Sequence, residues 1–182
     1  MPDPAAAWAF LEASDRVASA EQVDAALLRL TAEISGRYER AYPLVLAVMG
    51  GAVVFAGQLL PRLRFPLDFD YVHVTRYGVA TEGRRIEWRV APSEQVRGRE
   101  VLVLDDILDG GHTMLAIREE LLARGAASFR SAVLVEKELA RPKPIRADFV
   151  GLRIPDRFVF GCGMDAKGYW RNLPEVRAMR ES

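Results

Sequence analysis

The stretch Val-Leu-Val-Leu-Asp-Asp-Ile-Leu-Asp-Gly-Gly-His-Thr-Met, residues 101–114, decides how the chain is interpreted. Four apolar residues run directly into the adjacent carboxylates Asp105 and Asp106, and a third carboxylate follows at Asp109. A buried strand that ends in acids and glycines, with a helix opening at Thr113, is typical of an open α/β sheet. Ligands of such sheets lie outside the carboxyl ends of the parallel strands, so this strand end is the first place to look for a site.

Hydrophobic periodicity predicts strands alternating with helices through the middle of the chain. We expect amphipathic or apolar helices over residues 20–40, 52–63 and 113–124, the last with Met114, Ile117, Leu121 and Leu122 turned inward. We expect strands over residues 44–48, 67–75, 84–90, 101–104 and 129–135. Residues 76–83 are polar and glycine-flanked, which predicts a mobile hairpin loop. The alternation implies an α/β fold with a mostly parallel central sheet and helices on both faces.

Polar or glycine-rich turns follow three of the predicted strands. Met49-Gly50-Gly51 follows the first, the acid-glycine turn over residues 105–112 follows the second, and Lys137 follows the third. The carboxyl ends of parallel strands meet at one edge of the sheet, so all three turns should face a single cleft.

Length and composition place the chain among ordinary globular proteins. Its 182 residues suit a single domain, half of them are hydrophobic, and 25 basic residues balance 25 acidic ones, so no net charge argues for a nucleic-acid partner. Cys162 is the only cysteine, which argues against a disulfide framework and favours a reducing compartment. The first residues lack the basic region of a signal peptide, and no apolar run approaches the ~20 residues that span a bilayer. We therefore expect a cytoplasmic protein with no membrane partner.

The strand end at residues 105–113 has the residue types that a sugar phosphate needs. The amides of Gly110 and Gly111, with the hydroxyl of Thr113, suit a phosphate group. Asp105 and Asp106 suit the vicinal hydroxyls of a ribose or a hydrated Mg²⁺, and Asp109 is placed to shuttle a proton near the carbon that joins the sugar to its substituent. Aspartate is also favoured at caps and turns, so such a cluster taken alone has about an even chance of being structural.

The stretch over residues 101–113 resembles the 5-phosphoribosyl 1-diphosphate (PRPP) signature of type I phosphoribosyltransferases, and other segments extend the resemblance. Met49-Gly50-Gly51 is similar to the first loop of the hypoxanthine-guanine branch, in which the peptide at this point can be cis. Residues 76–78 are similar to its flexible catalytic loop, and residues 134–137 to the segment with its purine-reading lysine. Residues 148–174 are similar to its C-terminal hood, a small subdomain that covers the site, and we expect the N-terminal helix to contribute to that hood as well.

The resemblance implies a role for each residue on the PRPP side. Asp105 and Asp106 would bind the ribose 2′ and 3′ hydroxyls with Mg²⁺ nearby, and Asp109 would be the general base or acid at the purine N7. Tyr77 lies on the loop that would close over the transition state. Two groups would hold the phosphates: Gly110, Gly111, His112 and Thr113 the 5′-phosphate, and Met49, Gly50, Gly51 and Arg171 the pyrophosphate.

The resemblance also implies a base side. Lys137 would donate to the 6-oxo group of the purine, Phe158 would stack on the ring, and Val159 would meet its edge with backbone groups. Asp165 would hold Mg²⁺ through water. Taken singly, Phe158 and Val159 fit ordinary strand core and Lys137 fits a solvated loop charge.

The implied reaction converts hypoxanthine or guanine plus PRPP into IMP or GMP plus pyrophosphate, with Mg²⁺ as cofactor, in a homodimer or homotetramer. The alternative is a non-catalytic sensor of PRPP or nucleotides on the same fold, since some domains of this kind regulate transcription or other enzymes.

Overall fold

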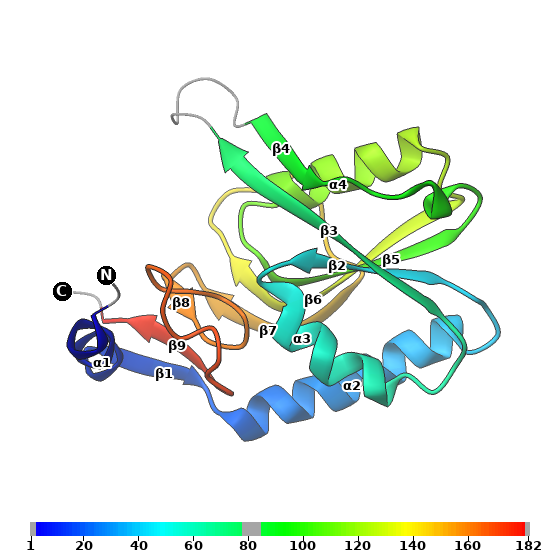
Figure 1. Ribbon diagram of the computed structural model, residues 1–182. Coiled ribbons are helices and arrows are strands. Elements are labelled where there is room, and N and C mark those ends of the chain that lie inside the picture. Colours follow the sequence, from blue (N-terminus) through cyan, green and yellow to red (C-terminus); the bar gives the residue numbers. More distant parts are fainter. Residues whose placement is uncertain (1–2, 78–84, 181–182) are drawn as a thin grey trace.

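The computed structural model describes residues 3–77 and 85–180, with the side chains of residues 76, 77 and 85 left out. Its centre is a six-stranded sheet in the order β4-β3-β2-β5-β6-β7 (Figure 1). The neighbouring strands are all parallel except for the β3–β4 pair, so the expected mostly parallel sheet is confirmed. The strands are β2 (Leu44–Met49), β3 (Asp68–Tyr77), β4 (Arg85–Val90), β5 (Glu100–Leu108), β6 (Ser128–Glu138) and β7 (Phe149–Pro155).

Helices cover both faces of the sheet, as the sequence predicts (Figure 1). The helices α2 (Ala20–Tyr38) and α3 (Ala52–Leu59) pack on one face, and α4 (His112–Ala123) packs on the other. Successive strand residues therefore enter different cores: Val45 packs with α2 and α3, whereas Leu44 packs with α4. A strand that is buried on both faces must be apolar at every position, which explains the unbroken run in β2.

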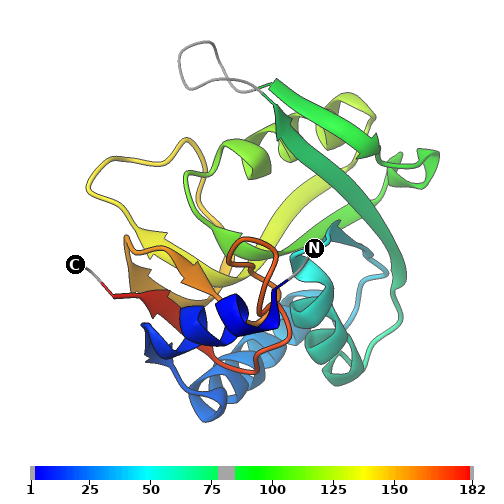
Figure 2. The ribbon, with the colours of Figure 1, turned by 60° about the vertical axis from the view of Figure 1, so that its left-hand side comes forward.

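A second, smaller sheet lies beside the carboxyl edge of the main one (Figure 2). Its three antiparallel strands are β1 (Ser14–Ala18), β9 (Val176–Met179) and β8 (Val159–Phe160), in that order, and α1 (Pro4–Glu12) lies next to them. We call these elements, with the segment between β8 and β9, the hood. The indole Nε1 of Trp170 donates to the carbonyl oxygen of Ala7 at 2.8 Å, and its ring meets Trp8 edge-on at 4.9 Å between centroids. Both ends of the chain thus build the hood.

Several element boundaries differ from the predicted ones. The helix predicted to end at residue 63 ends at Leu59 and continues as a 3-10 turn, η1 (Leu60–Arg62), because Pro61 supplies no amide hydrogen. Leu122 was expected to point inward and is 42% exposed, because it lies one step of about 100° beyond Leu121, which fills the core. A second 3-10 turn, η2 (Glu94–Val96), precedes β5.

The first two residues of the predicted mobile loop over residues 76–83 belong instead to β3, where they pair with β4, and the loop lies outside the described residues from residue 78 onward. In the described part of the chain, no helix combines the length and the apolar character needed to cross a bilayer.

Candidate active site

The two adjacent carboxylates of the opening stretch lie within β5 rather than in the turn where they were expected. The pairing of β5 with β6 continues through Asp105 to Leu108, so only residues 109–111 remain for the turn before α4. Asp105 and Asp106 are buried, and the amide of Asp106 donates to Asp105 Oδ1 at 3.0 Å. Burial raises the pKa of the Asp106 carboxyl, although a separate side-chain hydrogen bond with Asp105 and the positive charge of Arg171 act in the opposite direction. Buried carboxylates at a strand end are suited to a ligand that supplies hydroxyl groups or positive charge.

Asp109 and Lys137 come together at the ends of neighbouring strands. The ammonium nitrogen of Lys137 lies 3.3 Å from Asp109 Oδ1 and 3.8 Å from Oδ1 of Asp156, and the lysine side chain is only 12% exposed. The three side chains line a cavity of about 440 Å³, together with Leu139, Ala140 and Arg141. This arrangement offers an acid–base group and a cationic donor to one ligand. Asp156 was not expected as a site residue, although it follows β7 at the same edge of the sheet and is likewise a polar residue at a strand end.

The turn after Asp109 forms the start of α4. Gly111 has φ +81° and caps the helix, a conformation that suits glycine, and the amide of Leu115 donates to its carbonyl oxygen at 3.0 Å. The first N–H groups of a helix have no partner within that helix, and they point towards an anion placed before it. His112 is the first helical residue and Thr113 the second, so both lie in this first turn as expected.

The first loop meets the hood at a close backbone contact. The Met49–Gly50 peptide is cis, in line with the resemblance. Gly51 lies against Asp106, so that an added Cβ would overlap the carboxylate of Asp106. Gly163 of the hood packs on the Gly51 carbonyl group in the same way. Arg171 Nη1 donates to the carbonyl oxygen of Gly163 at 2.7 Å, so Arg171 and the first loop, both expected to bind pyrophosphate, are joined through Gly163.

Comparisons with known proteins identify the family of the chain. The phosphoribosyl transferase domain family matches residues 14–167. The hypoxanthine-guanine phosphoribosyltransferase of Bacillus subtilis is 32% identical over 163 residues, which cover 89% of this chain and 91% of the relative. The enzyme of the same name from Streptococcus pneumoniae is 30% identical over 165 residues, 90% of this chain and 91% of the relative.

The chain belongs to the hypoxanthine-guanine branch of the phosphoribosyltransferase family. A solved structure with this fold, a hypoxanthine-guanine phosphoribosyltransferase from Bacillus anthracis, superposes with a TM-score of 0.84 at 27% identity. The match covers 90% of this chain and 97% of that one, so the fold expected from the sequence is confirmed along almost its whole length.

The remaining residues expected from the phosphoribosyltransferase resemblance lie in or near the hood, except for Tyr77 at the end of β3. Arg171 Nη2 pairs with Asp165 Oδ1 at 2.6 Å. This ion pair joins the residue expected to bind pyrophosphate, Arg171, to the residue expected to hold Mg²⁺ through water, Asp165. Phe158 precedes β8, is 54% exposed and is not among the residues that line the 440 Å³ cavity, whereas Val159 is buried in β8. Tyr77 ends β3, and its side chain lies outside the described residues.

Asp105 and Asp106 fit the Mg²⁺ that this family implies. Among the residues described, no three or more His, Cys, Asp or Glu side chains gather closely enough to hold a metal ion by themselves. Mg²⁺ is commonly bound by one or two carboxylates together with water and substrate phosphates, and a buried pair of adjacent carboxylates meets that need. Asp165 accepts from the amide of Gly168 at 2.7 Å and from Arg171, so it is suited to contact through water.

Proposed function

We propose that the protein transfers the 5-phosphoribosyl group of PRPP to hypoxanthine or guanine, giving IMP or GMP and pyrophosphate. Purine salvage by phosphoribosyl transfer is the activity of the branch to which the chain belongs. The observation that carries the proposal for this chain is the Asp109–Lys137 pair, which faces a cavity at the strand ends, with Asp109 following the buried Asp105 and Asp106 along the chain.

On the sugar side, Asp105 and Asp106 bind the ribose 2′ and 3′ hydroxyls, and the turn Gly110–Thr113 holds the 5′-phosphate by amides and one hydroxyl. The loop Met49–Gly51 and Arg171 hold the pyrophosphate. Mg²⁺, held by Asp105 and Asp106 and through water by Asp165, would neutralise charge on the leaving pyrophosphate. The C1–O bond to pyrophosphate breaks while the bond from C1 to the purine nitrogen forms, through a state with oxocarbenium character. Carboxylates beside the sugar stabilise that positive charge.

On the base side, Lys137 donates a hydrogen bond to the 6-oxo group. Asp109 acts as the general base or acid that exchanges a proton with purine N7. The Asp109–Lys137 ion pair opens as the base enters between them. A lysine ammonium cannot accept a hydrogen bond from the 6-amino group of adenine, so we propose that oxopurines are selected over adenine. Phe158 stacks on the ring and the backbone of Val159 meets its edge. Tyr77 belongs to the loop that excludes water when it closes.

The test is release of pyrophosphate from PRPP in the presence of Mg²⁺ with hypoxanthine, guanine, xanthine or adenine as acceptor. We expect turnover with hypoxanthine and guanine and little with adenine. Asp109→Asn should lower kcat by about 10²- to 10⁴-fold, the range of general acid–base catalysis, whereas Glu119→Gln on the exposed side of α4 should not change it. Binding of PRPP without turnover of any purine would favour the regulatory alternative.

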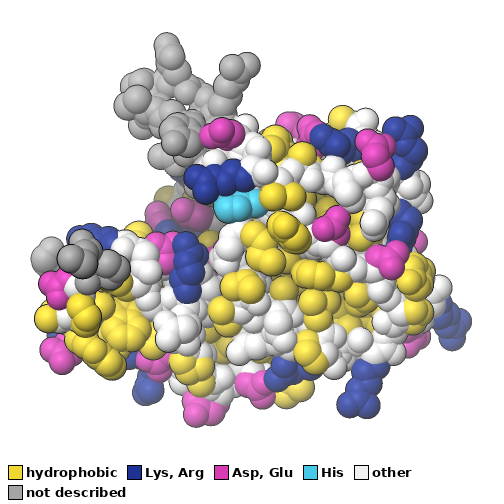
Figure 3. All heavy atoms as spheres, viewed as in Figure 1, with side chains coloured by type: hydrophobic (Ala, Val, Ile, Leu, Met, Phe, Trp, Pro, Cys, Tyr) yellow, Lys and Arg dark blue, Asp and Glu magenta, His cyan; other side chains and the backbone are white. Residues whose placement is uncertain are grey.

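We further propose that copies of this single domain associate as a homodimer or homotetramer in the cytoplasm. Hydrophobic side chains gather on the face formed by α3 and β3 (Figure 3), where Val53, Phe69 and Tyr71 are between 42% and 49% exposed. Contiguous exposed apolar surface is typical of protein interfaces. Light scattering coupled to gel filtration tests the association, and Phe69→Glu should weaken it. The lone buried Cys162 suits a reducing compartment.

A further inference from the structure

Lys143 has a charged side chain that is almost buried, and the proposed reaction gives it no role. It lies on the loop between β6 and β7, and its side chain is 9% exposed. Pro142 and Pro144 flank it, so both the loop backbone at Pro142 and the backbone of Lys143 itself are restricted. Burying an ammonium group is costly unless hydrogen-bond acceptors surround it. The loop therefore holds Lys143 in place for contacts that must be favourable.

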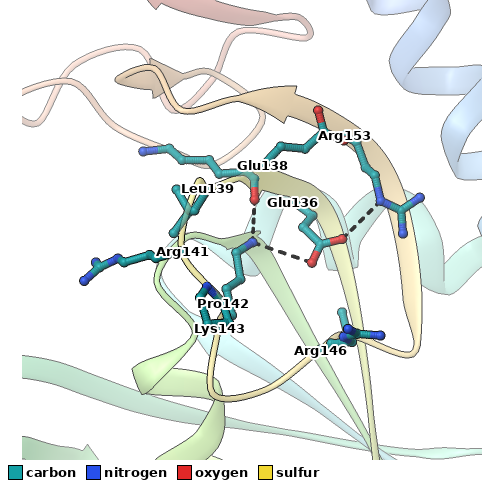
Figure 4. A pocket seen from close by; sticks show the side chains of 10 residues that line it. Glu136, Glu138, Leu139, Arg141, Pro142, Lys143, Arg146 and Arg153 are labelled. Atoms are coloured by element: carbon teal, nitrogen blue, oxygen red, sulfur yellow. Dashed lines mark hydrogen bonds and ion pairs between the residues drawn. The ribbon is translucent and has the colours of Figure 1, made fainter.

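The three contacts of Lys143 join the two strands that carry the proposed acid–base group and purine reader. Its Nζ donates to the carbonyl oxygen of Leu108 at 2.9 Å and to that of Lys137 at 2.5 Å. It also pairs with Glu136 Oε1 at 3.5 Å, and Arg153 Nε holds the other oxygen of Glu136 at 3.3 Å. Figure 4 shows Lys143 and Glu136 pointing towards one another, with dashed lines for the ion pairs of Glu136 with Lys143 and with Arg153. A lysine has three donors, so each contact can use one.

The carbonyl contacts lie where the pairing of β5 with β6 has ended. The last pair in the β5–β6 register is Leu108 with Glu136. Lys137 is still held by its pairing with Ile154 of β7, whereas Asp109 is the first residue of the turn after β5. Without another link, the distance between the two side chains would depend on the position of that turn. Lys143 supplies the link, because it binds the backbone immediately before Asp109 and the backbone of Lys137 itself.

The same loop also touches the phosphate turn. A Cβ at Gly111 would lie 3.3 Å from both Pro144 Cδ and Ile145 Cγ2, so the segment after Lys143 packs directly against Gly111. The loop thus contacts both ends of the turn that carries Asp109. Lys143 holds the Asp109 end of the turn through the Leu108 carbonyl oxygen, whereas Pro144 and Ile145 pack the Gly111 end, so loss of the Lys143 contacts should move Asp109 more than the phosphate-binding end.

We propose that Lys143 is a positioning residue that sets the distance between Asp109 and Lys137, and with it the fit of the purine. This inference rests on the proposed function, which it deepens. The cavity of about 370 Å³ beside Lys143 could instead suggest an anion site, since Arg141, Arg146 and Arg153 also line it. Figure 4 argues against that use, because Arg141 and Arg146 extend on opposite sides of the cavity and Arg153 is directed to Glu136.

The test compares Lys143→Met with the wild type in steady-state kinetics. Methionine keeps the length of the side chain and removes the donors. A misplacement of about 1 Å can cost on the order of 100-fold, so we expect kcat to fall by roughly 10- to 100-fold. The KM for hypoxanthine should rise several-fold, while the KM for PRPP stays within about twofold. A merely structural loss would lower the active fraction and kcat and leave both KM values unchanged.

Two variants of the same loop serve as controls. Arg146→Met removes an exposed charge that lines the same cavity and should leave both KM values and kcat unchanged. Lys143→Arg should restore most of the activity, because the adjoining cavity has room for a guanidinium group that can still donate to both carbonyl oxygens. If Lys143→Met is too unstable to purify, Glu136→Gln weakens the hold on the ammonium and should shift the same parameters in the same direction by a smaller factor.

The two proposals fail differently. A wild type that turns over no purine overturns the proposed function, and the role of Lys143 is then decided by a crystal structure of Lys143→Met. The separation of Asp109 Oδ1 and Lys137 Nζ should exceed the wild-type 3.3 Å in that variant. An active wild type with unchanged kinetics in Lys143→Met, or an unchanged Asp109–Lys137 distance in the variant structure, overturns the positioning role alone.

Discussion

Gly163→Ala tests whether the close contact between the hood and the first loop is needed for catalysis. Gly163 has φ +105°, and a Cβ there would overlap the carbonyl oxygen of Gly51 and lie 3.0 Å from its carbonyl carbon. The obstacle is backbone, so no change of rotamer can relieve it. Either the turn around Gly163 or the Met49–Gly51 loop must move.

The size of the effect follows from two separate costs. A non-glycine residue in a sparsely populated backbone region costs about 1–3 kcal/mol, and relief of the overlap adds to that. A loss of roughly 3 kcal/mol would lower the Tm by about 6–12 °C, since 1 kcal/mol corresponds to about 2–4 °C for a chain of this size. Restoring ordinary contact also requires a displacement of about 1 Å, which can reduce kcat/KM for PRPP by on the order of 100-fold.

Gly98→Ala is the matched control. Gly98 has φ +71°, but an added Cβ would meet nothing within 4 Å, and the residue lies before β5 at the opposite end of that strand from Asp106. This variant should lower the Tm by a few degrees for the backbone strain and leave kcat/KM unchanged. Both variants are measured by calorimetry and by the pyrophosphate assay. Wild-type kcat/KM in Gly163→Ala, with a loss of Tm no larger than in Gly98→Ala, would refute the reasoning.

Three further predictions concern buried groups. The hydroxyl of Tyr38 is buried with no hydrogen-bond partner in the described structure, so Tyr38→Phe should leave the urea unfolding free energy unchanged or raise it by up to about 1 kcal/mol; a clear loss would contradict this. Burial raises the pKa of Cys162 to about 12, so iodoacetamide at pH 8 should modify it only after denaturation, and rapid labelling of the folded protein would count against its burial. Burial also raises the pKa of Tyr38 to about 12, and the folded state therefore keeps protons that the unfolded chain loses near pH 9 and 10. Stability should consequently fall as the pH rises from 9 to 12, and less steeply in the double variant Tyr38→Phe, Cys162→Ala.

The order of helices and strands could be predicted because a strand that is buried on both faces of a sheet is apolar along its whole length. The β2 run is apolar at each position, and the helix positions Met114, Ile117 and Leu121 repeat at helical spacing, so strand and helix are distinguishable from the sequence. Leu122 shows the limit of that signal. A hydrophobic residue adjacent to the apolar stripe is compatible with either the core or the surface, and only the packing of α4 decides between them.

The hood was less predictable, because its contacts join residues far apart in the sequence. The helix α1 buries no residue, and β1 pairs with β9 across more than 150 residues, so neither element has a local pattern strong enough to reveal its partner. The indole of Trp170 reaches the carbonyl oxygen of Ala7 in the same way. Such pairings depend on where the fold places the two ends of the chain, which the periodicity of hydrophobic residues does not reveal.

The residues of the site also differ in whether the sequence predicts them. Asp105, Asp106 and Asp109 could be selected as site residues because the strand, the acidic residues and the glycines follow one another directly in the sequence. A site whose residues are close together in the chain leaves a local motif. Lys143 leaves none: it is a single lysine between two prolines, in a segment where solvated lysines are common. Its burial and its two carbonyl contacts follow from the fold of the β6–β7 loop over the ends of β5 and β6. Residues that touch a substrate can therefore be found from motifs, whereas residues that position them are found from the backbone groups they bind. In this chain that distinction separates Asp109 and Lys137, the proposed substrate contacts, from Lys143, the proposed positioning residue.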